Sequence, residues 1–190
     1  MQFDRVIKHF MTITKHKLTV MDLCFKVGMI KQGLLHDLSK YSPEEFLPGV
    51  KYYQGNRSPN AAEKLKNGFS KAWLHHKGRN KHHFEYWIDY SFNSEEGLVG
   101  MKMPLKYVLE MVCDRIAASM VYSGKEYNSA IPWKYYSKRE GQVIHLHPET
   151  KLLLEKLLLM NKDKGLKKTL AYMRWLYKHQ YVYDGKIYKG

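Results

Sequence analysis

The chain has 190 residues, of which 32 are Lys or Arg and 18 are Asp or Glu, so its formal net charge at pH 7 is +14. Hydrophobic residues make up 44% of the chain, which is enough for one compact core, and no run of about 18 apolar residues predicts a membrane span. Residues 1–5 lack a signal-peptide pattern, and Cys24 and Cys113 form no CxxC motif. These features exclude membrane, secreted, collagen and coiled-coil proteins, and we expect a cytoplasmic chain with two buried thiols.

The first half of the chain is predicted to be helical. Five residues recur at intervals of three, four or seven positions and therefore lie near one helix face: His16, Val20, Leu23, Val27 and Leu34. Ser42 is expected to cap the next helix, with Pro43 at its first position and Glu45 completing a capping box. Asn60 is expected to cap a further helix, which residues 78–80 end. Four side chains share a face of that helix: Leu65, Phe69, Trp73 and His76.

The second half is predicted to be helical apart from one irregular stretch. The expected order is a short aromatic helix over residues 82–90, a long helix from Pro104 to about Tyr122, an irregular loop over 125–147, and helices over 148–162 and 166–179. Gly124 ends the long helix, and residues 163–165 separate the last two. The predicted fold is all-α, a single-domain helical bundle over residues 1–190 with a basic helical extension over about residues 148–190.

Six histidines and two aspartates are candidate metal ligands. Imidazole and carboxylate groups bind divalent transition metals, and these candidates lie on different predicted elements: His16, His36, Asp37, His75, His76, His82, His83 and Asp114. Asp114 is the most informative of them, because its neighbours at helical spacing are apolar: Met111, Ala117, Ala118 and Val121. An ionised carboxylate on such a face is costly unless it binds a metal or pairs with a buried Arg or His. A purely structural pairing is the alternative for Asp114.

The order of these residues resembles the HD-domain superfamily of metal-dependent phosphohydrolases. The resemblance covers about residues 10–125 and rests on His16, the pair His36-Asp37, and Asp114. Residues 34–40, Leu-Leu-His-Asp-Leu-Ser-Lys, are similar to the family's apolar-apolar-His-Asp-apolar-Gly-Lys stretch, with Ser in place of the commoner Gly. The two His doublets, with Asn80 between them and Glu85 after them, resemble an uncharacterised bacterial and phage branch of that superfamily.

The resemblance implies a set of roles. His16, His36, Asp37 and Asp114 would bind a first ion, and Asp37 would bridge to a second ion completed by one His of each doublet. His76 is favoured over His75 because it shares a face with Trp73, whereas His82 and His83 stay equivalent. The implied cofactor is one or two divalent ions (Mn, Fe, Co, Ni, Zn or Mg). Lys40 would contact a substrate phosphate, and three neighbours of the doublets would neutralise its oxygens: Lys77, Arg79 and Lys81.

The expected activity is hydrolysis of a phosphate ester by metal-activated water, with Asp37, Lys40 and Arg79 as the catalytic residues. Because the chain is basic, we expect a phosphorylated small molecule, a nucleotide or a nucleic-acid-derived substrate, and no membrane partner. Three alternatives stay open. In one of them the metal-binding core is intact but has no catalytic activity. The same ligands resemble those of HD-type di-iron oxygenases. The chain also fits a non-catalytic nucleic-acid-binding module, in which the basic residues 151–190 would contact the phosphate backbone.

Overall fold

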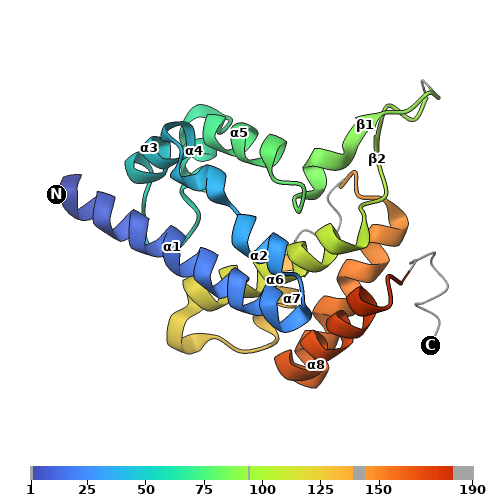
Figure 1. The fold of residues 1–190 in the computed structure, drawn as a ribbon. Coiled ribbons are helices and arrows are strands. Elements are labelled where there is room, and N and C mark those ends of the chain that lie inside the picture. Colours follow the sequence, from blue (N-terminus) through green and yellow to red (C-terminus); the bar gives the residue numbers. More distant parts are fainter. Residues whose placement is uncertain (1, 94, 139–143, 182–190) are drawn as a thin grey trace.

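The structure is a computed structural model that describes residues 2–93, 95–138 and 144–181. Over these residues the chain forms eight α-helices and one small two-stranded hairpin (Figure 1), so the all-α prediction is confirmed. In the same residues no helix is long and apolar enough to cross a membrane.

The helices are α1 (Gln2–Val27), α2 (Ile30–Leu35), α3 (Pro43–Lys51), α4 (Pro59–Asn67), α5 (Lys71–Arg79), α6 (Leu105–Ser123), α7 (Ile131–Ser137) and α8 (Pro148–Lys178). Three short 3-10 helices are η1 (Leu38–Tyr41), η2 (Phe84–Trp87) and η3 (Gly124–Glu126). Strands β1 (Ile88–Tyr90) and β2 (Leu98–Gly100) pair antiparallel, with Ile88 opposite Gly100. The hairpin that they form projects from the bundle in Figure 1.

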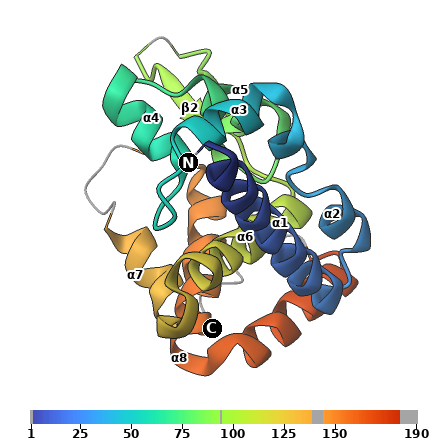
Figure 2. The ribbon, with the colours of Figure 1, turned by 90° about the vertical axis from the view of Figure 1, so that its left-hand side faces the viewer.

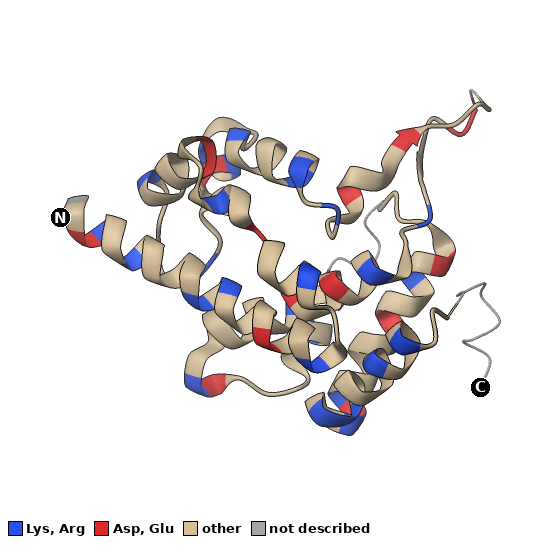
Figure 3. Cartoon of the chain, viewed as in Figure 1, with Lys and Arg blue, Asp and Glu red and all other residues tan. Residues whose placement is uncertain are grey.

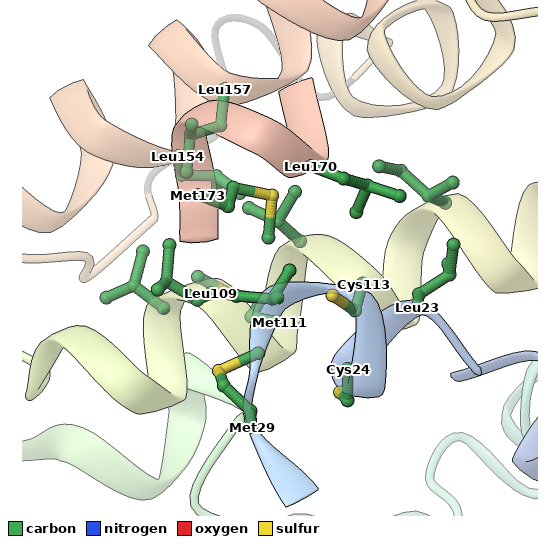
Figure 4. Close-up of a cluster of buried hydrophobic side chains, with 14 of the residues drawn as sticks. Leu23, Cys24, Met29, Leu109, Met111, Cys113, Leu154, Leu157, Leu170 and Met173 are labelled. Carbon is green, nitrogen blue, oxygen red and sulfur yellow. The ribbon is translucent and has the colours of Figure 1, made fainter. Parts of the chain in front are cut away.

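The hydrophobic core lies where α1, α6 and α8 pack together. Figure 4 shows Leu23 and Cys24 of α1 near Cys113 of α6, with α8 side chains such as Leu154 and Met173 completing the cluster. Each of these side chains is almost completely buried, and burying one large apolar side chain contributes about 1.5–3 kcal/mol. Both cysteines are buried free thiols, as predicted. This core fixes the relative position of α1 and α6, which carry His16 and Asp114.

The helix predicted from Asn60 to beyond His76 is wrong in its continuity, because it is two helices. Gly68 takes a left-handed conformation (φ 78°) and ends α4, and Ser70 then caps α5 by accepting a hydrogen bond from the Trp73 backbone N–H at 2.9 Å. The break leaves Leu65 and Phe69 exposed at 75% and 49%, rather than on one buried face. Ser58, not Asn60, occupies the N-cap position of α4.

Two further predictions are corrected and one is confirmed. Residues 82–90 form η2 and β1 instead of an α-helix, because Ile88–Tyr90 pairs with β2. The stretch predicted as an irregular loop contains η3 and α7, while residues 139–143 of it lie outside the described residues. The predicted break in the last helix is present at Gly165, which is non-helical (φ 80°, ψ 165°). Figure 2 shows that the two arms of α8 run in different directions.

Candidate metal centre

Seven of the eight candidate ligands converge at one place in the bundle. Helix α1 supplies His16, the junction of α2 and η1 supplies His36 and Asp37, and α5 supplies His76. The segment after α5 supplies His82 and His83, and α6 supplies Asp114. Most of them are buried, with an exposed fraction of 6% for His16 and 1–2% for His36, Asp37, His76 and His82. Segments far apart in the sequence therefore place imidazole and carboxylate groups together away from water.

The local fold at Asp37 explains how two consecutive residues enter one cluster. Asp37 follows α2 and adopts a left-handed backbone conformation (φ 52°, ψ 27°), which is uncommon outside glycine and tolerated best by Asp and Asn. The chain turns sharply there and starts η1. As a result the Nε2 atom of His36 lies 3.2 Å from the Oδ2 atom of its neighbour Asp37. Strained backbone of this kind concentrates at functional sites.

One oxygen of Asp37 faces the group that we call the first subsite: His16, His36, Asp37 and Asp114. The Oδ2 atom of Asp37 is 3.6 Å from Nε2 of His16 and 3.2 Å from Nε2 of His36. The Oδ1 atom of Asp114 is 3.0 Å and 3.7 Å from the same two nitrogens. Two imidazoles and two carboxylates thus surround one point.

The other oxygen of Asp37 faces the second subsite: Asp37, His76, His82 and His83. The Oδ1 atom of Asp37 is 3.2 Å from Nε2 of His76 and 3.4 Å from Nε2 of His82. Within each subsite the potential ligand atoms all lie within 4.8 Å of one another. Asp37 therefore occupies the bridging position between two groups of ligands, each of which can hold a metal ion.

The inward-facing atoms fit a cation better than they fit each other. Four imidazole nitrogens, together with Oδ1 of Asp37, are buried and have no hydrogen-bond partner among the described residues: the Nε2 atoms of His16, His36, His82 and His83. A buried polar atom without a partner costs about 1–3 kcal/mol. Several such atoms aimed at two common points are what a pair of divalent ions would satisfy, so the donor set fits the metal cofactor that the sequence predicted.

Two glutamates orient the imidazoles from the outer side. The Oε1 atom of Glu110 lies 2.9 Å from Nδ1 of His36 and 3.2 Å from Nδ1 of His82, so one carboxylate contacts a ligand of each subsite. Glu45 accepts hydrogen bonds at 2.7 Å from Nδ1 of both His75 and His76. A carboxylate on Nδ1 fixes the tautomer in which Nε2 is free to bind a metal.

Neither glutamate is predicted from the sequence as part of the centre. Glu45 was assigned to a capping box, but the Ser42 side chain makes no capping hydrogen bond and the Glu45 carboxylate faces the histidines instead. Glu110 precedes Asp114 by one helical turn, so both lie on one side of α6. A second buried carboxylate at that spacing was a usable signal.

The charged groups of the cluster shift the pKa values of one another. Burial opposes the charged form of His36, but Asp37, Asp114 and Glu110 outweigh burial and raise its pKa well above 6.5. Burial would likewise raise the pKa of Asp37, yet His36, Lys40 and His76 hold it well below its usual value. Since a metal needs the neutral imidazole, a bound ion must displace the proton from His36.

A cavity of about 460 Å³ adjoins the cluster. His16, His76, His83 and Asp114 of the cluster form part of its wall, and three cationic side chains also line it: Lys40, Arg57 and Arg115. The Nζ atom of Lys40 lies 2.5 Å from Oδ2 of Asp37. Burial would lower the pKa of Lys40, but Asp37 and Asp114 raise it, so the side chain stays charged. Aromatic walls come from Trp73, Phe84, Tyr122 and Tyr135.

Residues 5–160 match a family model described as a family of unknown function, DUF5662. The chain belongs to the DUF5662 family. The matched region includes both subsites and both orienting glutamates, and it ends inside α8 before the break at Gly165. No curated protein and no solved structure matches the chain.

The two His doublets of this DUF5662 protein contribute differently to the centre: His75-His76 supplies one ligand and His82-His83 supplies two. His76 belongs to the second subsite, as expected, whereas His75 lies outside both subsites with its ring bonded to Glu45. Consecutive helical residues point about 100° apart, so only one of this pair can face Asp37. His82 and His83 follow the helix, and both enter the second subsite.

The cations expected beside the doublets do not line the cavity over the residues that the structure describes. Lys77, Arg79 and Lys81 are not among the described residues that line the cavity; Arg79 and Lys81 are exposed, and the Lys81 Nζ atom lies 5.5 Å from the centre of the Tyr86 ring. Lys40 does line the cavity, and its contact with a substrate phosphate stays a prediction. Arg57 and Arg115, which line it as well, were not predicted. Arg115 directly follows Asp114, whereas nothing local marks Arg57, which reaches the cavity from the loop before α4.

Proposed function

We propose that this DUF5662 protein is a metal-dependent phosphohydrolase that acts on a phosphate ester. One observation carries the proposal: the Asp37 carboxylate offers one oxygen to each subsite, and Lys40 contacts the same carboxylate at the wall of a cavity. A bridged pair of sites about 3.5–4 Å apart is the arrangement that many phosphatases and nucleases use. The ordered resemblance to HD-domain proteins points the same way.

The residues have distinct tasks in this proposal. Asp37, with three partners in each subsite, would hold the two ions. Ions held there would lower the pKa of bound water and would offset the charge that builds up on a phosphoryl group. Lys40 and Arg57 would bind the non-bridging phosphate oxygens, because cationic side chains make strong hydrogen bonds to phosphate. In the hydrolysis a water oxygen would bond to phosphorus, the ester P–O bond would break, and the leaving oxygen would take up the proton that the water loses.

The cavity supports an organic phosphate as the substrate. Trp73, Phe84 and Tyr135 give it aromatic walls, and the side chains of Asn56 and Asn60 add hydrogen-bonding groups. An aromatic surface beside cations suits a base or a sugar attached to the phosphate. A nucleotide or a fragment of nucleic acid is therefore the substrate class that we propose.

A substrate screen on metal-loaded protein tests this function. The metal-free chain is reloaded with Mn²⁺, Co²⁺ or Zn²⁺ and assayed with p-nitrophenyl phosphate, bis-p-nitrophenyl phosphate and nucleoside monophosphates. We expect phosphate or nitrophenol release that a chelator abolishes and that Asp37→Asn lowers by about 100-fold or more. His75→Gln, altered in the same doublet segment but outside both subsites, should stay active. Metal-loaded wild-type protein that releases nothing from any of these substrates would refute the proposal.

A second candidate, a di-iron oxygenase, is favoured by the imidazole-rich second subsite. Iron in the purified protein and oxygen consumption without phosphate release would identify it.

A nucleic-acid-binding module is the third outcome. Lys and Arg are spread over all of the long helices in Figure 3, and salt-dependent binding to DNA or RNA that survives metal removal would support that function.

A further inference from the structure

The two subsites differ in their donor atoms. The first subsite has two imidazoles and two carboxylates, whereas the second has three imidazoles and one oxygen of the shared Asp37. His83 makes the difference, since without it each subsite would have two histidines. The expected pattern of one ligand from each doublet does not account for this third imidazole.

His83 has the geometry of a ligand. Its Nε2 atom is buried and has no hydrogen-bond partner among the residues that the structure describes. Its ring centre lies 4.2 Å from that of His82 and 4.8 Å from that of His76. The Trp73 ring packs against His83 in a T-shaped arrangement, with 4.8 Å between ring centres. The imidazole is thus confined beside its two partners.

A short turn fixes this placement. The Asn80 side chain donates to the backbone carbonyl of His76 at 2.8 Å, and the His83 backbone N–H donates to the carbonyl of Asn80 at 3.1 Å. The turn reverses the chain immediately after α5, which brings His82 and His83 back over His76. The three imidazoles therefore belong to one short hydrogen-bonded segment, residues 76–83.

Donor type decides which ion a site prefers. Imidazole favours Zn²⁺, Ni²⁺, Co²⁺ and Fe²⁺, whereas carboxylate and water favour Mg²⁺ and Mn²⁺. We propose that the two subsites hold different ions: the second subsite selects an imidazole-preferring ion such as Zn²⁺ through His83, and the first subsite accepts Mn²⁺. The inference rests on the proposed function, because it assigns ions to the same centre.

Native mass spectrometry on the full chain tests it, since this method separates chains that hold mixed ions from chains that hold two like ions. Metal-free protein receives one equivalent of Zn²⁺ and an excess of Mn²⁺. We expect mostly chains with one Zn and one Mn. In His83→Gln the preference of Zn²⁺ for the second subsite should fall by about tenfold or more, and the ions should approach a random distribution. His75→Gln is the matched control and should behave like wild type.

The outcomes separate this inference from the proposed function. A random mixture of Zn–Zn, Zn–Mn and Mn–Mn chains in wild type would overturn the inference and leave a two-metal hydrolase intact. So would an unchanged distribution in a folded His83→Gln variant, with folding checked by circular dichroism. Wild-type protein that binds no ion would refute both the inference and the proposed function. If the variant fails to fold, the wild-type distribution still decides whether the two subsites prefer different ions.

Discussion

Replacing Glu110 by Gln is the sharpest perturbation of the centre, because its Oε1 atom contacts a ligand of each subsite, at 2.9 Å from His36 and 3.2 Å from His82. Gln keeps the shape of the side chain and a hydrogen-bond acceptor but removes the charge. Losing the partner that orients a metal-binding histidine weakens metal binding about 10–100-fold. Tenfold is about 1.4 kcal/mol. We expect a loss of about tenfold in affinity at each subsite, because Gln keeps the hydrogen-bond acceptor. The total loss of metal-binding free energy over two ions is then about 3 kcal/mol.

Titration of metal-free protein against a chelator of known affinity measures both binding constants. Glu110→Gln should lower both of them, whereas Glu45→Gln should lower only that of the second subsite, because Glu45 contacts His76 and no ligand of the first. Both variants should keep the wild-type helix content. Binding constants that stay within about threefold of wild type in Glu110→Gln, or a loss at one subsite only, would refute the bridging role of this carboxylate.

Three further predictions follow from the charges around the centre. The metal-free protein should be most stable near pH 6.5, as measured by urea unfolding between pH 4 and 9. Above that pH the contribution of His36 and His76, whose pKa values are raised, is lost as they deprotonate in the folded state. Below it, burial and Lys40 lower the pKa of His9 to about 4, so the unfolded state takes up a proton that the folded state does not. A stability that rises steadily to pH 9 would contradict this balance. Lys40→Gln should keep both ions, as measured by elemental analysis. Inhibition by inorganic phosphate should weaken about tenfold or more, because one charge-assisted hydrogen bond to phosphate is lost. Loss of an ion in this variant would instead mean that Lys40 has a structural role. Arg57→Ala should raise KM, whereas Arg79→Ala should not, and the reverse order would place the substrate outside the cavity.

Local patterns in the sequence were enough to predict the helical class and most of the centre. Asp114 on an apolar helix face was costly without a partner, and that cost correctly indicated a buried polar cluster. Gly165 broke the last helix where predicted. The prediction of one continuous helix from Asn60 to beyond His76 was wrong, because the periodicity of the apolar residues does not reveal that Gly68 is left-handed.

The cations near the cavity differ from the predicted ones for a different reason. The prediction that Lys77, Arg79 and Lys81 contact the substrate phosphate relies on neighbours in sequence also being neighbours at the site. On α5, however, each residue is rotated by about 100° from the last, and Arg79 faces solvent. Arg57 reaches the cavity from a loop that no local motif marks. Only the packing of distant segments brings it there.

The metal content of wild-type protein and of Asp37→Ala tests the central claim most directly. Both are purified without chelator and measured by elemental mass spectrometry, with reloading from metal-free protein as a second measurement. Asp37 gives one oxygen to each subsite, so we predict two divalent ions per wild-type chain and the loss of both in the variant. A wild-type chain that neither carries nor takes up metal, or an Asp37→Ala chain that keeps two ions, would contradict the account.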